Sequence, residues 1–536
     1  MKFETLGNNK KILLGTVIVF VVILTLIIST SLAKYKVTES INIASGTINY
    51  SPSDLSIMGI YLEGDNGYTQ SDTIPESGYV LNSEESYCKV GDSNVDVAIS
   101  YDINTKMLTI SPMTSKGMKC FLYFDKVLNA QSIIANSTIS TRSSFTSAIT
   151  ASSTGVLYST EDDDGTSYYY AGAATDNYVY FAGFYWRIVR INGDGTIRLI
   201  YAGTSAVENG TSSSDTQIST SKFNPSYDDN TYVGYMYGTA DTWVDGGISD
   251  HTVDWWTSTS KSYYYAKSYS FNTTTGEYSL SGTKTSGVLS EDFVGYLTCF
   301  NTYSTKTCAT LYYISEVEDE MSAKVYTYER TGSGNITYAN AHANNNNSTI
   351  KGVLDSWYTS NLASYSDYIS NDAGFCGDRT SYLWNSSTYV SGYETGKTET
   401  VYGAYIRLVN KKAPSLKCTN SSDLYTTSTS SKGNKSLTYP IGLITSDEVV
   451  YAGGKSSTSN SSYYLYTGQD YWTISPYQFN GGGHAHNFHI NSSGTLTGSS
   501  DYVTATKGVR PVINLRADTE FKSGTLGTAA SPYEVV

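Results

Sequence analysis

The chain has 536 residues and a formal net charge of -14, with 39% apolar and 16% charged residues, where globular proteins average about 45–50% and about 25%. Its 50 tyrosines and many small polar residues fit neither a disordered chain nor a long coiled coil. The acidic balance disfavours a nucleic-acid partner, because phosphate binding needs a cationic surface. The composition therefore predicts a predominantly β protein with an aromatic surface, of the kind found outside cells.

The N-terminal segment predicts export. Residues 12–28 are an uncharged apolar run, and with the flanking residues to position 33 the segment is long enough to cross a bilayer. One interpretation is a retained signal anchor that holds the protein in the membrane through residues 12–33, with the ectodomain outside the cell. The other is a signal peptide cleaved after Ala33, because Ser31 and Ala33 have the small side chains of a cleavage site. In the second case the protein is secreted.

Six cysteines agree with an exported protein. Their clustering favours pairing between neighbours in the sequence, although six cysteines allow 15 pairings. The predicted disulfides are Cys88–Cys120, Cys299–Cys308 and Cys376–Cys418. No C-x-x-C motif occurs, so neither a thiolate zinc site nor thioredoxin-type chemistry is indicated.

The first module after the export segment is predicted to be a small, disulfide-stapled, β-sandwich-like domain over residues 34–127. Val95–Tyr101 alternates between apolar and polar residues, as a half-buried strand does, and Met107–Ser111 returns after a turn. Residues 128–160 are rich in serine and threonine and have few large apolar side chains. They are predicted to form a spacer.

A larger domain is predicted over residues 161–536. It begins with a hairpin of Val179–Arg190 and Thr196–Tyr201, joined at the turn Asn192–Gly195. Further hairpin patterns at about 240–330 predict an inserted β subdomain.

One helix is predicted within this larger domain. Ile350, Val353, Leu354 and Trp357 follow helical spacing, and the polar residues before them offer an N-cap. Several short strands follow up to Leu515, so the predicted class is α+β, predominantly β.

Six sequence blocks in the larger domain form a set. They are YFAGFYWRIVRINGDGTIRLIY (180–201), STIKGVLDSWYTSNL (348–362), GFCGDR (374–379), YPIGLITSDEVVYAGG (439–454), YYLYTGQDYWTISPY (463–477) and GVRPVINL (508–515). In order and spacing the set resembles an uncharacterised family of exported surface proteins from low-GC gut bacteria, over roughly residues 160–536. The last two blocks also resemble the formylglycine-generating-enzyme branch of the C-type-lectin-like fold.

The lectin-like resemblance implies an architecture without the enzyme's chemistry. It implies that the early hairpin pairs with the strand of the GVRPVINL block, and that loops between Trp472 and that strand bind a ligand. The enzymes of that branch use a closely spaced cysteine pair near the C-terminus, whereas Cys376 and Cys418 are 42 positions apart. The residues that would perform the oxidation are therefore missing.

The loops at about 476–508 carry the predicted ligand contacts. Aromatic side chains offer flat apolar faces with a polar tip, which suit stacking on sugars or holding peptides. Core packing is expected for Trp472 and Ile474, because about half of the aromatic residues in 463–477 point inward. The predicted contact residues are Tyr477, Gln478, Phe479, Asn480 and His484.

The same region holds three of the five histidines, at His484, His486 and His489. On a strand, His484 and His486 would face the same way, as a zinc or other divalent-metal site needs. The alternative is that the cluster only decorates an exposed loop. No cofactor besides this possible metal ion is predicted.

Two acidic turns, Asp162–Gly165 and Asp228–Asn230, are rich in oxygen donors for calcium, but their spacing is not that of an EF-hand loop. They are predicted to be solvated turns. No Ser–His–Asp triad can be argued from the sequence.

Three functional hypotheses follow. The first is a non-enzymatic surface protein, adhesin-like, that binds an extracellular glycan or protein through its C-terminal loops. The second is a structural subunit of a surface layer or matrix fibre, in which tyrosine-rich faces pack against copies of themselves. The third and weakest is a metal-dependent enzyme that uses the histidine cluster.

Overall fold

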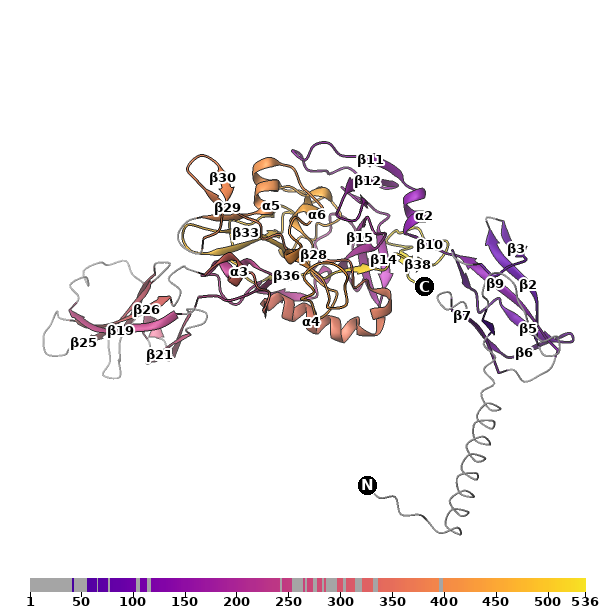
Figure 1. The fold of residues 1–536 in the computed structure, drawn as a ribbon, viewed down its shortest axis with the longest axis horizontal. Coiled ribbons are helices and arrows are strands. Elements are labelled where there is room, and N and C mark those ends of the chain that lie inside the picture. The colour runs from indigo at the N-terminus through magenta and orange to yellow at the C-terminus, as the bar shows by residue number, and fades with distance from the viewer. Residues whose placement is uncertain are drawn as a thin grey trace, which may run out of the picture. The chain divides into compact units, whose positions relative to one another are not determined.

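A computed structural model describes residues 41–42, 55–64, 66–75, 78–102, 107–112, 117–241, 336–394 and 399–536, together with the backbone of the strands between 243 and 330. The predicted membrane segment at 12–33 and the cleavage site after Ala33 lie outside the described residues. Among those described, no helix is both long and apolar enough to cross a membrane. The described part is mainly β, with several separate sheets and few helices (Figure 1).

The chain divides into two compact units. The first contains the residues up to Leu128 together with Glu520–Ser523 and Val536, and the second contains Asn129–Thr519 and Gly524–Val535.

The first unit has a six-stranded sheet in the order β3-β2-β9-β5-β6, with β4 also paired to β9. The strands are β2 (Leu55–Gly64), β3 (Gly67–Ser71), β4 (Tyr79–Leu81), β5 (Tyr87–Val90), β6 (Ser93–Val95) and β9 (Met118–Lys126). Alternate residues of β9 are buried, which gives this strand one core face. Cys88 of β5 lies directly opposite Cys120 of β9, and their side chains form the predicted disulfide inside that core.

A three-stranded sheet in the order β1-β8-β7 also lies in the first unit. It contains β1 (Ile41–Asn42), β7 (Ala98–Asp102) and β8 (Met107–Ser111). Antiparallel pairing of Tyr101 with Leu108 confirms the predicted hairpin. Ile99, Leu108 and Ile110 share one hydrophobic core with Leu122 and Phe124 of the larger sheet.

Residues 128–160 are not a spacer. They contain β10 (Leu128–Asn129), α2 (Ala130–Ala135), β11 (Thr138–Thr141) and the start of β12 (Val156–Glu161). β11 pairs in parallel with β12, and Asn129 caps α2 through a capping box. The spacer was predicted from the low apolar content of this stretch. Backbone pairing and polar caps give it an ordered structure instead. The guanidinium of Arg142, for instance, donates to the backbone oxygens of Val450 and Ser147.

The second unit is built on two eight-stranded sheets. The first has the order β11-β12-β13-β15-β14-β39, and β16 pairs with both β15 and β37. Its further strands are β13 (Thr166–Tyr169), β14 (Tyr178–Phe181), β15 (Phe184–Ile191), β16 (Ile197–Gly203), β37 (Val512–Leu515) and β39 (Tyr533–Glu534). β15 and β16 confirm the predicted hairpin, and their turn uses a positive φ of 84° at Gly195. The pairing of β16 with β37 is the one that the lectin-like resemblance implies.

The second sheet has the order β17-β36-β33-β31-β29-β30, and β34 pairs with β33 on one side and with β35 on the other. Its strands are β17 (Ser219–Ser221), β29 (Ser381–Trp384), β30 (Tyr389–Ser391), β31 (Thr400–Tyr402), β33 (Tyr471–Phe479), β34 (Ala485–Ile490), β35 (Leu496–Thr497) and β36 (Lys507–Val509). Trp472 and Ile474 are fully buried, as expected.

The predicted helix is α4 (Thr349–Asn361). Ser348 is its N-cap and accepts a hydrogen bond from the backbone N–H of Lys351. Ile350 and Leu354 are completely buried, whereas Val353 and Trp357 are half-buried. Figure 1 shows α4 below the sheets of this unit.

The strands between 243 and 330 pair among themselves, where an inserted subdomain is predicted. β19 (Trp243–Thr252), β26 (Met321–Arg330), β25 (Thr305–Tyr313), β24 (Tyr296–Asn301), β20 (Tyr264–Tyr265) and β23 (Lys284–Thr285) form one sheet in that order. β21 (Ser268–Asn272) and β22 (Glu277–Ser281) form a separate hairpin. The register sets Cys299 opposite Cys308. Whether these two cysteines are bonded lies outside what the structure describes.

Candidate functional sites

The predicted C-terminal contact residues do not form one exposed surface. Phe479 is completely buried, because β33 continues to this residue and pairs there with Thr400 and Ala485. The prediction that Phe479 contacts a ligand is therefore wrong. Gln478 and Tyr477 are half-buried on the same strand.

Asn480 and His484 form a tight turn after β33. The Asn480 side-chain oxygen accepts hydrogen bonds from the backbone N–H groups of Gly482 and His484, both at 3.0 Å. The His484 ring stacks on Tyr502 with 4.6 Å between ring centroids, and it also lies 5.2 Å from Tyr227. Tyr502 is 39% exposed, so this small stack reaches the surface.

The ring nitrogens of His486 are already engaged. Nδ1 lies 2.9 Å from the carbonyl oxygen of Asp501, and Nε2 lies 3.0 Å from the Asn480 side-chain amide nitrogen. A carbonyl oxygen only accepts, so Nδ1 carries the proton and Nε2 receives the amide N–H. The nitrogen that could bind a metal is thus occupied.

His489 is 1% exposed and packs against Trp472, with its Nε2 3.5 Å from the Asp501 carboxylate. Burial, aided by the Lys507 ammonium, lowers the pKa of His489 to about 4, so the ring is neutral at pH 7. Within the described part of the chain, no group of three or more His, Cys, Asp or Glu side chains could hold a metal ion.

A row of four aromatic side chains includes Tyr477, one of the predicted contact residues. We call it the aromatic row: Trp384, Tyr389, Tyr405 and Tyr477. Successive ring centroids are 5.0, 5.7 and 5.1 Å apart. Trp384 is 47% exposed, and the other three are half-buried.

Local structure positions the aromatic row. Trp384 ends β29 directly opposite Tyr389 of β30, which is an edge strand. Tyr405 ends α5 (Gly403–Tyr405), and its hydroxyl lies 3.4 Å from that of Tyr389. Burial, with Tyr405 as a second cause, raises the pKa of Tyr477 to about 12, so its hydroxyl stays protonated and can donate. Of this row, only Tyr477 was singled out from the sequence, because the others lie in unrelated segments.

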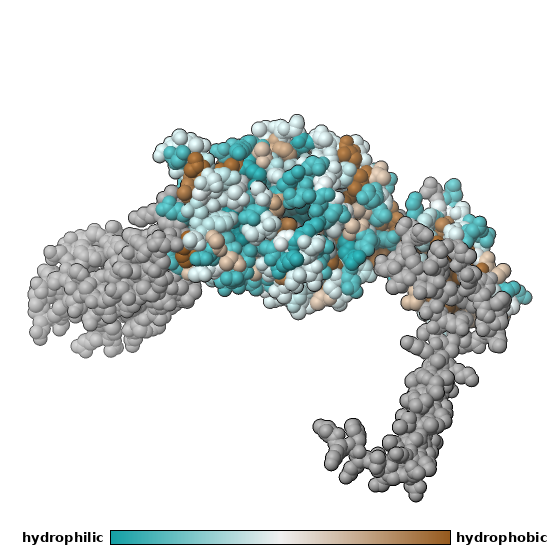
Figure 2. All heavy atoms as spheres, viewed as in Figure 1, coloured by the Kyte–Doolittle hydropathy of each residue, from teal (hydrophilic) through white to brown (hydrophobic). Residues whose placement is uncertain are grey.

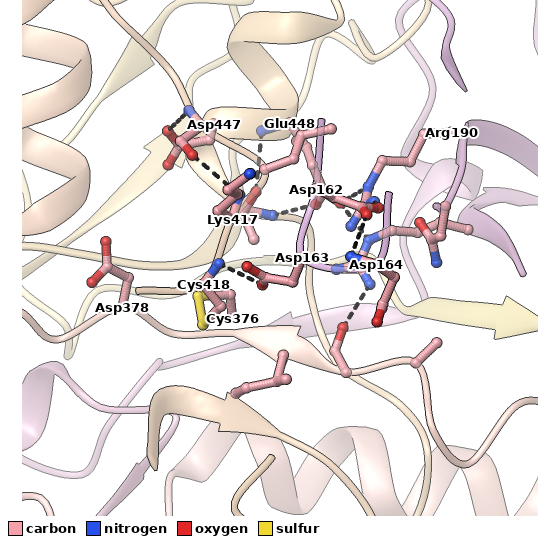
Figure 3. A pocket seen from close by; sticks show the side chains of 18 of the residues that line it. Asp162, Asp163, Asp164, Arg190, Cys376, Asp378, Lys417, Cys418, Asp447 and Glu448 are labelled. Carbon is pink, nitrogen blue, oxygen red and sulfur yellow. Dashed lines mark hydrogen bonds and ion pairs between the residues drawn. A yellow bond between two sulfur atoms is a disulfide. The ribbon is translucent and has the colours of Figure 1, made fainter. Parts of the chain in front are cut away.

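A charged pocket of about 90 Å³ lies elsewhere in the second unit, with room for several water molecules. Figure 2 shows a hollow with a hydrophilic rim on this unit, where Figure 1 labels α6 and β28. Its walls include the turn after β12, the hairpin β15–β16, β28 (Phe375–Cys376) and α6 (Ser446–Tyr451). The disulfide Cys376–Cys418, predicted from the sequence, forms part of the wall (Figure 3).

Ion pairs organise the floor of the pocket. The Glu448 carboxylate lies 3.0 Å from the Arg190 guanidinium and 2.5 Å from that of Arg198, and Arg190 also meets Asp162 at 2.8 Å. Burial by itself would raise the pKa of Glu448, but the two guanidinium groups outweigh it and hold the pKa below its usual range. The Glu448 side chain also accepts the backbone N–H of Thr445 and so completes the capping box of α6.

A second set of ion pairs lies on the opposite side of the pocket. The Arg407 guanidinium makes two hydrogen bonds of 2.8 Å to the carboxylate of Asp447 and also pairs with Asp378. Burial opposes the charge on Arg407, but the two carboxylates outweigh it and raise its pKa. Figure 3 shows Asp163 turned toward the disulfide, where it accepts the backbone N–H of Cys418 at 2.7 Å.

The acidic turn at 162–165 is thus not merely solvated. Asp162 is only 7% exposed and accepts the backbone N–H groups of Asp164 and Gly193 as well as the Arg190 pair. The other pocket residues lie far apart in the sequence. Many of them belong to the blocks GFCGDR and YPIGLITSDEVVYAGG and to the early hairpin. Their occurrence in one set of sequence blocks is the signal by which the sequence could have grouped them.

Comparisons with known protein families, with curated proteins and with solved structures find no match to this chain.

Proposed function

We propose that this protein is a non-enzymatic surface protein that binds an extracellular glycan through the aromatic row. The observation that carries the proposal is Trp384, a large aromatic residue that is 47% exposed at the end of a line of tyrosines. Flat aromatic faces stack on the apolar face of a sugar ring. Tyrosine hydroxyls beside these faces can donate hydrogen bonds to the hydroxyls of the sugar and accept hydrogen bonds from them. Tyr389 and Tyr405 supply such hydroxyls.

We infer the location of the protein from its predicted export segment. The segment at 12–33 would export the chain and either anchor it or be cleaved, so that the described units face the outside. The two disulfides that the structure describes fit an oxidising compartment.

The finer architecture belongs to the same proposal. A sandwich-like first unit is supported by the single core that its two sheets share. A lectin-like second unit is supported by the pairing of β16 with β37.

A glycan and mucin array tests the binding proposal. We expect the full chain, purified in detergent, to bind at least one glycan, and Trp384→Ala to weaken that binding by about tenfold or more, as loss of a central aromatic contact does. Tyr368→Ala is the matched control, because Tyr368 is 39% exposed but lies outside the row. Tyr502→Ala tests the stack at His484. Equal binding by wild type and Trp384→Ala would reject the aromatic row as the site.

The structural-subunit hypothesis is the second candidate, because another aromatic surface exists. Tyr365 and Tyr368, 37% and 39% exposed, flank Phe181 with ring centroids 5.5 and 5.9 Å away. Such rings can pack against a second copy of the chain. Sedimentation that shows oligomers in wild type but monomers in Tyr365→Ser/Tyr368→Ser, together with a blank glycan array, would favour this function.

A further inference from the structure

The charged pocket contains one buried oxygen without a partner. Asn192 lines the pocket, is 7% exposed, and its side-chain oxygen has no hydrogen-bond partner. Its nitrogen donates to Thr196 Oγ1 at 2.7 Å and to Asn514 Oδ1 at 3.2 Å. Because both neighbours act as acceptors there, the amide cannot be turned round. A buried carbonyl oxygen left without a donor costs free energy, which a donating ligand would recover.

The charge of the pocket favours a cation. Eight carboxylates and five cationic side chains line it, which leaves an excess of three negative charges. The carboxylates are Asp162, Asp163, Asp164, Asp194, Asp372, Asp378, Asp447 and Glu448, and the cations are Arg190, Arg198, Arg407, Lys417 and Lys432. All three arginines are committed to ion pairs, and Lys432 is shared between Asp164 at 2.7 Å and Asp194 at 3.5 Å.

The walls of the pocket are partly apolar. Ala373, Leu416 and Leu424 line it beside the charged groups. An alkyl stem can lie along such side chains while its charged end reaches the oxygens, as lysine side chains commonly do.

We propose that the pocket binds a primary ammonium group on an unbranched alkyl stem, as a lysine side chain of a partner protein presents. The ammonium has three donors and no acceptor, which matches the Asn192 oxygen and the neighbouring carboxylates. A bare metal ion fits less well, because among the described residues no set of three ligating side chains converges. The site lies outside the aromatic row and does not depend on the proposed glycan binding.

Calorimetry at low salt tests the proposal with the full chain in detergent and Nα-acetyl-lysine methylamide as probe. We expect binding that weakens with salt and is lost when the probe's amine is acetylated. Asp163→Asn keeps an acceptor for the Cys418 N–H and should weaken binding about fivefold, the usual effect of one ion pair. Asp163→Lys should abolish binding, because its own ammonium would reach the pocket.

Two controls separate the site from general electrostatics and from the aromatic row. Asp92→Asn removes an equal charge from an exposed position in the first unit and should leave binding unchanged. Trp384→Ala should also leave it unchanged. Absence of amine binding, equal binding of the acetylated probe, or binding unaltered by Asp163→Asn in a protein of unchanged melting temperature would overturn the proposal. Tighter binding of glucosamine than of the lysine probe would overturn it in favour of an amino-sugar site.

Discussion

The charged pocket and the histidine tip, by which we mean residues 480–489 with Asp501 and Tyr502, are two polar regions of the same unit. At the tip, both ring nitrogens of His486 meet groups of the chain itself. The His489 ring is neutral at pH 7 and buried against Trp472. In the pocket, the unpartnered Asn192 oxygen lines an open, negatively charged space. The contrast teaches that a cluster of reactive residue types matters less than whether their polar atoms are already used within the fold.

The largest expected effect concerns the floor of the pocket. Glu448→Gln should lower the free energy of unfolding of the second unit by about 3–5 kcal/mol, because two buried guanidinium groups lose their shared countercharge. Urea unfolding followed by tryptophan fluorescence measures this, since all seven tryptophans follow residue 128. Thr445→Ala, which removes the helix cap alone, should cost about 1 kcal/mol. Equal costs for both variants would mean that Glu448 acts only as a cap.

The pocket wall comes next in size. Replacement of Cys376 and Cys418 by serine should cost about 2–4 kcal/mol, because the disulfide spans 42 positions and restricts the unfolded chain. The same unfolding measurement applies. A double serine variant at Cys88 and Cys120 is the matched control and should leave the fluorescence transition in place, because that disulfide lies in the first unit. A shift of the transition by the control alone would contradict this assignment.

The histidine tip contributes to the response to acid through His489, in addition to the buried His342, whose pKa is also lowered by burial and by the Arg379 guanidinium. The pKa of His489 is lowered from 6.5 to about 4 in the folded chain, so between these values the unfolded chain binds more protons. Its contribution is fully present above pH 6.5 and is lost as the pH falls toward 4, by about 2 kcal/mol at pH 5.

His489→Asn should remove that part of the pH dependence. Asp501, Asp470 and Lys507 surround the ring, and their charges are the other local contributors. Melting temperatures measured between pH 7 and pH 5 give the comparison. A variant that loses stability as steeply as wild type over this range would show that the ring is already charged or accessible.

The smallest effect is expected from zinc at the tip. Because the Asn480 amide occupies Nε2 of His486, zinc should raise the melting temperature by less than about 1 °C at concentrations near 100 µM. A rise of several degrees that disappears in His484→Ala would break the contrast between the two regions and revive the metal hypothesis.

The sequence by itself determined the local elements. Alternation and turn residues predicted the β7–β8 and β15–β16 hairpins, apolar spacing with a polar N-cap predicted α4, and cysteine clustering predicted the two disulfides seen here. These features depend on neighbours in the chain, and periodicity records such neighbours directly.

Tertiary structure alone decided the sites. The burial of Phe479 depends on strands at both of its sides, and the order of 128–160 depends on pairing and caps that composition does not reveal. The charged pocket gathers Asp162, Arg198, Asp378 and Glu448 from four distant segments. Whether an acidic side chain is solvated or committed to an ion pair is set by residues hundreds of positions away, because Coulomb attraction and desolvation act through space and not along the chain.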